Sequence, residues 1–195
     1  MSYLTHNENK YYFLHIPKTG GSTVRVLLRP LDSWREIYHE PLSKKPEAYT
    51  FTTIRNPLDR LVSAFFYLSR GGINKSDKAD SERFSISDSF DNFVHRLTSN
   101  PKHYFKQQHL RPMIEYINDV KYIDRFMVFD DLEREIISLY KMITGKDLKK
   151  IPHRNKSKHK YFETYYTKKT KALVESVYSE DLKLYQKALF DAACY

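Results

Sequence analysis

Residues 11–24 are Y-Y-F-L-H-I-P-K-T-G-G-S-T-V, and the fold prediction starts from this stretch. The apolar run at 11–16 is typical of a buried strand. Pro17, Lys18 and two successive glycines interrupt the run, and helical spacing of apolar residues resumes directly after them. The stretch therefore predicts a strand, a glycine turn and the start of a helix, in that order.

This order of elements is suited to binding a phosphate group. A helix N-terminus offers backbone N–H groups without intrahelical partners and the positive end of the helix dipole. Gly20 and Gly21 let the backbone approach an anion closely. Lys18 adds a positive charge, and Ser22 and Thr23 add hydroxyl donors. We predict a nucleotide-type ligand here, and an ordinary turn between strand and helix is the alternative interpretation.

The loop differs from a Walker A loop. In the Walker A pattern, G-x-x-x-x-G-K-[ST], the lysine follows the last glycine. In this chain Lys18 precedes both glycines, so the lysine approaches the anion from the side of the strand.

A second anion-binding segment is predicted at residues 55–63, R-N-P-L-D-R-L-V-S, directly after a strand at 49–55. Arg55 would lie at the carboxyl end of that strand, where α/β folds place their ligands. Ser63 would lie about two turns into the following helix. A guanidinium and a hydroxyl can together bind one phosphate. Two such sites match a nucleotide with phosphates at both its 5′ and 3′ ends.

Both segments resemble a known enzyme family. The residues H-I-P-K-T-G-G-S-T at 15–23 resemble the 5′-phosphosulfate loop of sulfotransferases that use 3′-phosphoadenosine-5′-phosphosulfate, PAPS. They are most similar to the carbohydrate-modifying branch, which includes heparan sulfate 2-O-sulfotransferases and their small bacterial relatives. The resemblance implies that Arg55 and Ser63 hold the 3′-phosphate and that 3′,5′-ADP is the product. It also implies cofactor contacts from seven loop residues: Pro17, Lys18, Thr19, Gly20, Gly21, Ser22 and Thr23.

Transfer of a sulfuryl group to a hydroxyl needs a base for the hydroxyl proton, and histidine suits this role near neutral pH. We select His39, because sulfotransferases of the resembling branch often carry a histidine at this place. Glu40 and Glu36 are the alternative bases, and an exposed loop histidine is the alternative interpretation of His39. His15 is expected to pack in the first strand or to orient the loop. The resemblance implies that Lys18 contacts the bridging oxygen and stabilises charge on the leaving 3′,5′-ADP.

The most basic segment of the chain is P-H-R-N-K-S-K-H-K at residues 152–160. Its position before the last helices resembles the N-x-S lid segment of the family, which implies cofactor contacts from Asn155, Lys156 and Ser157. A solvated basic loop is the alternative. Four residues are expected to contact the acceptor. Glu40 and Arg154 are assigned from their charge, and Gln107 and Gln108 because the family often has a glutamine in such a helix.

The net charge of +9 over 195 residues suits anionic partners. We expect the acceptor to be a saccharide or another hydroxyl compound, with an anionic saccharide favoured, and we expect no nucleic-acid partner. No catalytic metal is expected, because lysine and arginine supply the positive charge and no H-E-x-x-H motif or EF-hand loop occurs. The single cysteine, Cys194, excludes an internal disulfide.

The chain contains no apolar run near the roughly 18 residues of a membrane span. Its start, M-S-Y-L-T-H-N-E-N-K, lacks the apolar core of a signal peptide. We therefore expect a soluble cytoplasmic enzyme, with a trimmed catalytic domain as the alternative.

The alternation of strands and helices predicts an α/β fold, P-loop-like and three-layered, in which helices flank a short parallel sheet. One sulfotransferase domain is expected over residues 1–195. Strands are predicted at 11–16, 49–55 and 123–129, and residues 70–86 are predicted to form a loop. Helices are predicted near 21–30, 57–68, 88–98, 106–117, 130–143 and 167–192, the last in two pieces. Asn56-Pro57 and Gly145 supply a helix start and a helix stop.

Two other classes of function remain open. A P-loop-like kinase or NTPase is disfavoured by the absent Walker lysine and by the second phosphate site. A non-catalytic binder of nucleic acid or polyanions would use the basic surface and the 16 tyrosines, although their helical spacing near the C-terminus favours packing. The leading prediction is a PAPS-dependent sulfotransferase that works by in-line transfer.

Overall fold

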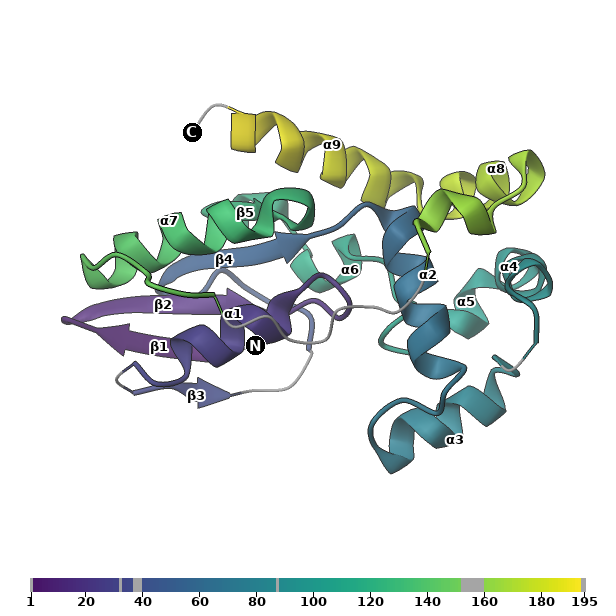
Figure 1. Cartoon of the computed structure of the whole chain (residues 1–195), viewed down its shortest axis with the longest axis horizontal. Helices are drawn as coiled ribbons and strands as arrows, with labels where there is room; N and C mark the ends of the chain where they lie inside the picture. The colour runs from purple at the N-terminus through teal and green to yellow at the C-terminus, as the bar shows by residue number, and fades with distance from the viewer. Residues whose placement is uncertain (1, 32, 37–39, 87, 152–159, 194–195) are drawn as a thin grey trace. The chain divides into compact units, whose positions relative to one another are not determined.

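The chain forms a five-stranded sheet with the strand order β3-β1-β2-β4-β5 within the described residues. The computed structural model describes residues 2–31, 33–36, 40–86, 88–151 and 160–193 (Figure 1). Strands β2, β4 and β5 are parallel, whereas β1 is antiparallel to both β2 and β3. The strands are β1 (Ser2–His6), β2 (Asn9–Leu14), β3 (Arg35–Glu36), β4 (Tyr49–Ile54) and β5 (Arg125–Val128).

The three predicted strands are confirmed as β2, β4 and β5, with ends that differ by at most two residues. Strands β1 and β3 were not predicted. Strand β1 pairs with β2 through a two-residue turn at Asn7 and Glu8, both with positive φ, of 48° and 65°. Such a turn matches the twist of a hairpin, and asparagine adopts this conformation readily.

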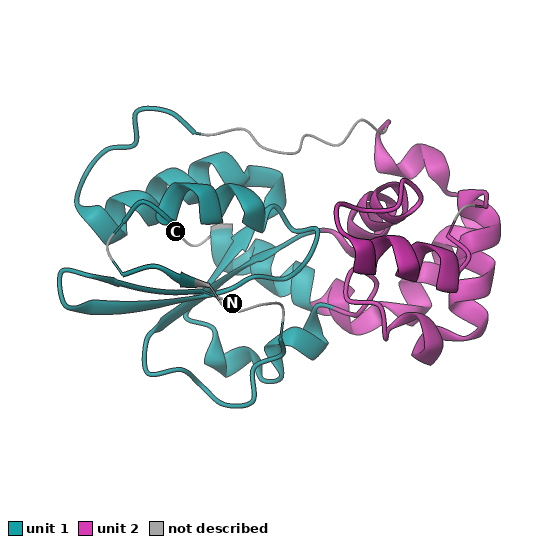
Figure 2. Ribbon diagram, turned by 90° about the horizontal axis from the view of Figure 1, so that it is seen from below, with its two compact units in different colours: residues 1–55, 113–156, 184–195 teal, residues 56–112, 157–183 magenta. Residues whose placement is uncertain are grey.

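The chain divides into two compact units, coloured separately in Figure 2. The sheet unit comprises residues 1–55, 113–156 and 184–195, and the helical unit comprises residues 56–112 and 157–183. Helix α9 (Ser179–Ala193) crosses the boundary between them in sequence. The expectation of one sulfotransferase domain over the whole chain stays a prediction.

Helices cover both faces of the sheet in the sheet unit. Alternate residues of β2 point to opposite faces, so Tyr11 and Phe13 belong to one buried cluster and Tyr12 and Leu14 to another. The first cluster includes residues of α1 (Gly21–Leu28) and α7 (Leu132–Thr144). The second includes residues of α6 (Ile114–Ile117) and of α9 from residue 184 onward. This layering confirms the predicted α/β class with helices on both faces of the sheet.

Short 3-10 turns border strand β5. They are η1 (Val120–Tyr122) before the strand and η2 (Phe129–Asp131) after it. Helix α7 then ends at Gly145, where φ is +69°, as the sequence predicted.

The helical unit is built around an aromatic core. Its members include Phe65, Phe90, Phe93 and Tyr104, which pack with ring centroids 5.2 to 6.3 Å apart. Offset and edge-to-face ring pairs stabilise such a core beyond the area they bury. The helices are α2 (Pro57–Leu68), α3 (Lys75–Arg83), α4 (Phe90–Ser99), α5 (Pro101–Tyr104), η3 (Phe162–Tyr165) and α8 (Lys168–Val177).

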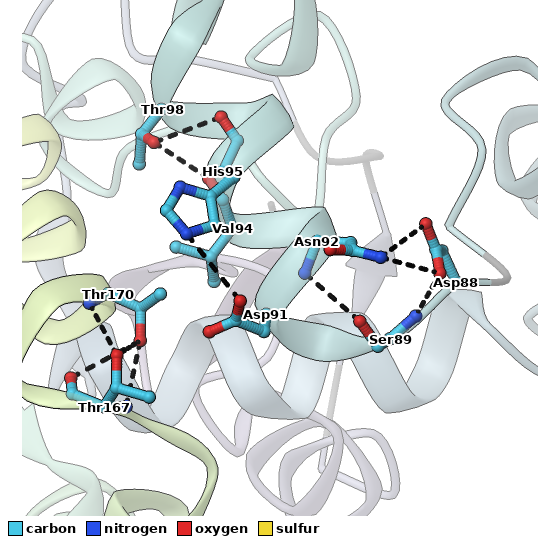
Figure 3. Close-up of polar contacts among 9 residues, drawn as sticks. All are labelled: Asp88, Ser89, Asp91, Asn92, Val94, His95, Thr98, Thr167 and Thr170. Atoms are coloured by element: carbon cyan, nitrogen blue, oxygen red, sulfur yellow. Dashed lines mark hydrogen bonds and ion pairs between the residues drawn. The ribbon is translucent and has the colours of Figure 1, made fainter.

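Side-chain caps define where several of these helices begin. The Asn56 side chain accepts a hydrogen bond from Leu58 N at 2.9 Å, which confirms the predicted start of α2. Helix α4 begins at a Ser89 cap with Asp88 beside it, and α8 begins at a reciprocal capping box of Thr167 and Thr170 (Figure 3).

Two sequence predictions about helices were wrong. Residues 70–86 are not a loop, because α3 occupies Lys75–Arg83. Residues 106–117 are not one helix, since only α6 at Ile114–Ile117 is helical in that range. Both errors concern segments whose conformation depends on tertiary contacts more than on a periodic apolar stripe.

Arg60 has a structural role in the helical unit. Its side chain is 2% exposed, Nη1 lies 3.9 Å from Asp181 Oδ2, and Nη2 donates a hydrogen bond to the Arg111 carbonyl at 2.8 Å. Tyr178 and Tyr166 likewise use their hydroxyl groups to donate to backbone carbonyls, of Leu110 and Leu58. These tyrosines are structural residues rather than stacking platforms.

Candidate functional site

The candidate site begins where β2 ends. Strand β2 finishes at Leu14, residues 15–20 form the loop, and α1 starts at Gly21. Because β2, β4 and β5 are parallel, their carboxyl ends share one edge of the sheet. Arg55 follows β4 and Phe129 follows β5 at this edge. The predicted strand, turn and helix are therefore present, at the edge where α/β proteins bind ligands.

Both loop glycines are required by their surroundings. Gly20 has φ +88°, and a Cβ there would lie 2.9 Å from Cδ2 of Phe129 and would also collide with Leu132. At Gly21 a Cβ would overlap the His15 imidazole and lie 3.0 Å from Cζ of Phe13. His15 in turn stacks on Phe13, with centroids 5.6 Å apart. The loop backbone is thus packed tightly against side chains of the sheet unit.

Lys18 adopts the left-handed conformation, with φ +68°. This conformation costs a residue other than glycine about 1 kcal/mol. The Lys18 carbonyl accepts a hydrogen bond from Nη1 of Arg55 at 3.2 Å, which helps to hold the residue in place. Its side chain is half-buried. Strained residues of this kind persist where the surrounding structure fixes them, and they concentrate at functional sites.

Thr19 anchors the loop through its hydroxyl group. Its side chain is fully buried, and Oγ1 donates to the Ile16 carbonyl at 2.8 Å and lies 2.6 Å from the Thr53 hydroxyl. These bonds fasten the loop to β4. The cofactor contact of Thr19 stays a prediction.

The N-terminus of α1 retains the features of an anion site. Its N-cap is Gly20, which supplies no side-chain cap, and the first turn carries no acidic residue. Ser22 and Thr23 in that turn are half-buried. A helix start of this kind attracts an anion through its first N–H groups and its dipole. The residues present therefore fit a phosphate or sulfate group.

Arg55 lies next to this loop. Its side chain is 5% exposed, and the guanidinium carbon lies 4.1 Å from the centroid of the Phe129 ring. Ser63, its predicted partner, is a buried residue of α2. Arg55 belongs to the sheet unit and Ser63 to the helical unit, so their joint binding of one phosphate stays a prediction.

Several predicted residues lie outside the described part of the chain. They are His39, Arg154, Asn155, Lys156 and Ser157. Glu40 is described and exposed. Its charge, together with that of Tyr3 and the dominant effect of burial, raises the pKa of the Tyr12 phenol. The Glu40 carboxylate therefore interacts electrostatically with the Tyr12 side chain of β2.

Gln107 and Gln108 differ in their exposure. Gln107 is fully buried, its Nε2 donates to Asp80 at 3.3 Å, and its Oε1 accepts from His109 N at 2.5 Å. Those contacts are structural, so Gln107 holds its own segment in place. Gln108 is half-buried, and the prediction that it contacts the acceptor stays open.

Sequence reasoning missed a buried polar cluster in the helical unit. Asp77, 1% exposed, accepts a hydrogen bond from the Tyr67 hydroxyl at 2.5 Å, and its Oδ1 lies 3.3 Å from His109 Nε2. The hydrogen bond with His109 is the main cause that lowers the pKa of Asp77 to about 2. The cluster connects α2, α3 and the segment around residue 109.

The described residues contain no group of three or more His, Cys, Asp or Glu side chains placed to hold a metal ion. Within the same part of the chain, no helix has the length and apolar character needed to cross a membrane.

Together, the fold and the loop define an α/β protein that carries a glycine turn between its first parallel strand and helix. The model of the sulfotransferase family matches residues 1–188, so the chain belongs to that family. Membership supports sulfuryl transfer to an acceptor as its general chemistry. Searches of curated proteins and of solved structures gave no match.

Proposed function

We propose that this protein is a PAPS-dependent sulfotransferase that transfers the sulfuryl group to a hydroxyl of a carbohydrate acceptor. The observation that carries the proposal is the glycine loop at residues 15–21, packed between β2 and α1 beside Arg55, in a chain of the sulfotransferase family. The loop offers main-chain donors and a helix N-terminus to one phosphate. Arg55 offers a guanidinium close by.

The loop residues would hold the 5′-phosphosulfate, chiefly through the N–H groups of residues 19–23. PAPS, when bound, supplies an activated sulfuryl group. Lys18 is proposed to neutralise charge that builds up on the leaving phosphate, as positively charged groups do in phosphoryl transfer. Arg55 and Ser63 are proposed to bind the 3′-phosphate, and Asn155, Lys156 and Ser157 to close over the cofactor.

His39 is the proposed general base that accepts the proton of the acceptor hydroxyl. Glu40 and Glu36 remain the alternatives. His39→Ala should remove turnover while 3′,5′-ADP affinity is retained. Unchanged turnover in that variant would transfer the role to one of the glutamates.

The acceptor is proposed to be an anionic saccharide, in keeping with the similarity to the heparan sulfate 2-O-sulfotransferase branch and its small bacterial members. The net charge of +9 supports an anionic partner. Gln108, Glu40 and Arg154 are the proposed acceptor contacts. Gln107, being buried among structural partners, is proposed to position the segment that carries Gln108.

The test is a transfer assay with sulfur-labelled PAPS and a panel of acceptors: sulfated and unsulfated uronic-acid oligosaccharides, neutral oligosaccharides, simple alcohols and a tyrosine peptide. Label on an anionic oligosaccharide, absent with Lys18→Ala, is the expected result. Label only on the peptide would overturn the carbohydrate assignment. Absence of transfer together with ATP hydrolysis in magnesium would overturn the sulfotransferase proposal and favour an NTPase.

A further inference from the structure

Phe129 is a residue that neither composition nor motif singled out. It is the first residue of η2, directly after β5, and it is half-buried. The parallel pairing of β4 with β5 places it at the edge of the sheet that also carries Arg55. Phe129, Arg55, Lys18 and Gly20 all belong to the sheet unit.

The Phe129 ring contacts both parts of the candidate anion site. The Arg55 guanidinium carbon lies 4.1 Å from the ring centroid. The edge of the ring packs on Gly20, where a Cβ would lie 2.9 Å from Cδ2 and 3.1 Å from Cε2. Arg55 donates to the Lys18 carbonyl at 3.2 Å. Contacts thus connect Lys18 to Arg55, Arg55 to Phe129, and Phe129 to Gly20.

An aromatic face suits a guanidinium that must also bind an anion. The cation–π interaction orients the planar group without using any of its N–H donors. A long side chain fixed before binding loses less conformational entropy when the ligand arrives. A leucine at the same position would fill much of the volume but would offer no π face.

We propose that Phe129 is a positioning residue that holds Arg55 ready for a phosphate and couples it to the glycine loop. The inference rests on the proposed function, because it gives Arg55 a phosphate to bind. Phe129 itself takes no part in the chemical step. Its effect is on the affinity for the phosphate that Arg55 contacts.

The test compares two nucleotides on the Phe129→Leu variant. Titration calorimetry measures the affinity for 3′,5′-ADP and for 5′-AMP, which lacks the 3′-phosphate assigned to Arg55. Loss of a cation–π contact of about 1 kcal/mol corresponds to about a 5-fold weaker affinity for 3′,5′-ADP. The affinity for 5′-AMP should change by less than about 2-fold, since the loop donors remain.

A double-mutant cycle with Arg55→Ala makes the test specific. If Phe129 acts through Arg55, Phe129→Leu has no further effect on 3′,5′-ADP affinity once Arg55 is alanine. The proposal would be overturned if Phe129→Leu weakened the affinity for both nucleotides equally, or if it weakened 3′,5′-ADP affinity as much in the Arg55→Ala background. Either result would mean that Phe129 only supports the glycine loop. Phe129→Trp should keep 3′,5′-ADP affinity, and Phe105→Leu serves as a half-buried phenylalanine control.

A ligand-free measurement separates this inference from the proposed function. In the NMR spectrum the Arg55 side-chain resonances should be shifted upfield by the Phe129 ring current and should return to ordinary values in Phe129→Leu. Identical Arg55 shifts in the two proteins would overturn the inference. Failure of the wild type to bind either nucleotide would instead defeat the proposed function, while the NMR comparison still decides the Phe129–Arg55 contact.

Discussion

Substitution of Gly21 by alanine tests how closely the loop is packed. Gly21 is the first residue of α1, and its φ lies outside the left-handed region, so alanine is acceptable to the backbone. The obstacle is the His15 imidazole, which an added Cβ would overlap, with Nε2 only 2.6 Å away. The predicted effect therefore comes mainly from the contact with His15, to which Cζ of Phe13 at 3.0 Å adds a milder one.

The size of the effect follows from two opposing terms. Forcing a methyl group into a packed site costs about 1–3 kcal/mol. Replacing glycine by alanine within a helix returns about 0.5–1 kcal/mol. We expect Gly21→Ala to lower the free energy of unfolding by about 1–2 kcal/mol, or the melting temperature by about 3–6 °C for a chain of this size. We also expect weaker 3′,5′-ADP binding, because the first N–H groups of α1 must move.

Removing the obstacle should reverse the effect. In a His15→Ala background only the 3.0 Å contact with Cζ of Phe13 remains, so Gly21→Ala should cost less there, and the two substitutions should be non-additive by about 1–2 kcal/mol. Chemical denaturation and thermal melting of the four proteins give this coupling energy. Gly145→Ala is the contrasting case: no atom lies within 4 Å of its Cβ position, so its cost comes from the left-handed backbone, with φ +69°, and should be the same with and without His15. An equal cost of Gly21→Ala with and without His15 would refute the reasoning.

Three further substitutions test other contacts. Asp77→Asn should make the free energy of unfolding depend less on pH between 2 and 4. In the wild type the ionised Asp77, whose pKa is lowered to about 2, contributes about 1–2 kcal/mol of stability above pH 4, and this contribution is lost as the pH falls towards 2. Asp181→Ala should lower the free energy of unfolding by about 3 kcal/mol, because it leaves the Arg60 charge buried without its carboxylate. Thr19→Val should cost about 1–3 kcal/mol by removing the buried hydroxyl that donates to Ile16, whereas Thr19→Ser should cost less.

Each of these predictions has a control or a contrary outcome. Denaturation curves between pH 2 and 7 follow Asp77→Asn, and a pH profile parallel to that of the wild type would contradict the expectation. The exposed pair Asp88–Arg96, 2.7 Å apart, is the control for Asp181, and breaking it should cost far less than breaking the buried pair. A Thr19→Val protein as stable as Thr19→Ser would show that the hydroxyl bonds contribute nothing.

The parts of the fold that sequence predicted are those with local signals. The strand, glycine turn and helix around residue 20 carry their own apolar pattern, and Asn56 and Gly145 act on the helix ends next to them. The short antiparallel strand at residues 2–6 was missed. Its buried and exposed residues alternate over only five positions, which is a weak periodic signal.

Helix α3 shows why some elements escape prediction. Its sequence, K-S-D-K-A-D-S-E-R, has no apolar stripe, and its buried residues are Asp77 and Ser81. The helix is held by the Asn74 cap and by polar contacts of Asp77 with Tyr67 and His109, which are distant in sequence. Such contacts become visible only when the partner segments are placed in space.

The candidate site likewise contains residues that the sequence predicted and a residue that it did not. The loop residues and Arg55 were predicted because each directly follows a strand. The contribution of Phe129 depends on the parallel pairing of β4 with β5, which brings residues far apart in sequence together. The roles of Ser63 and His39 remain predictions from the resemblance.

The central claim is that the loop and Arg55 bind a nucleotide with phosphates at its 5′ and 3′ ends. Titration calorimetry of the wild-type chain with 3′,5′-ADP, 5′-AMP and ATP, each with and without magnesium, tests it most directly. The account predicts that 3′,5′-ADP binds most tightly and that magnesium does not change its affinity. Tighter binding of ATP with magnesium, or equal affinities for 3′,5′-ADP and 5′-AMP, would contradict it.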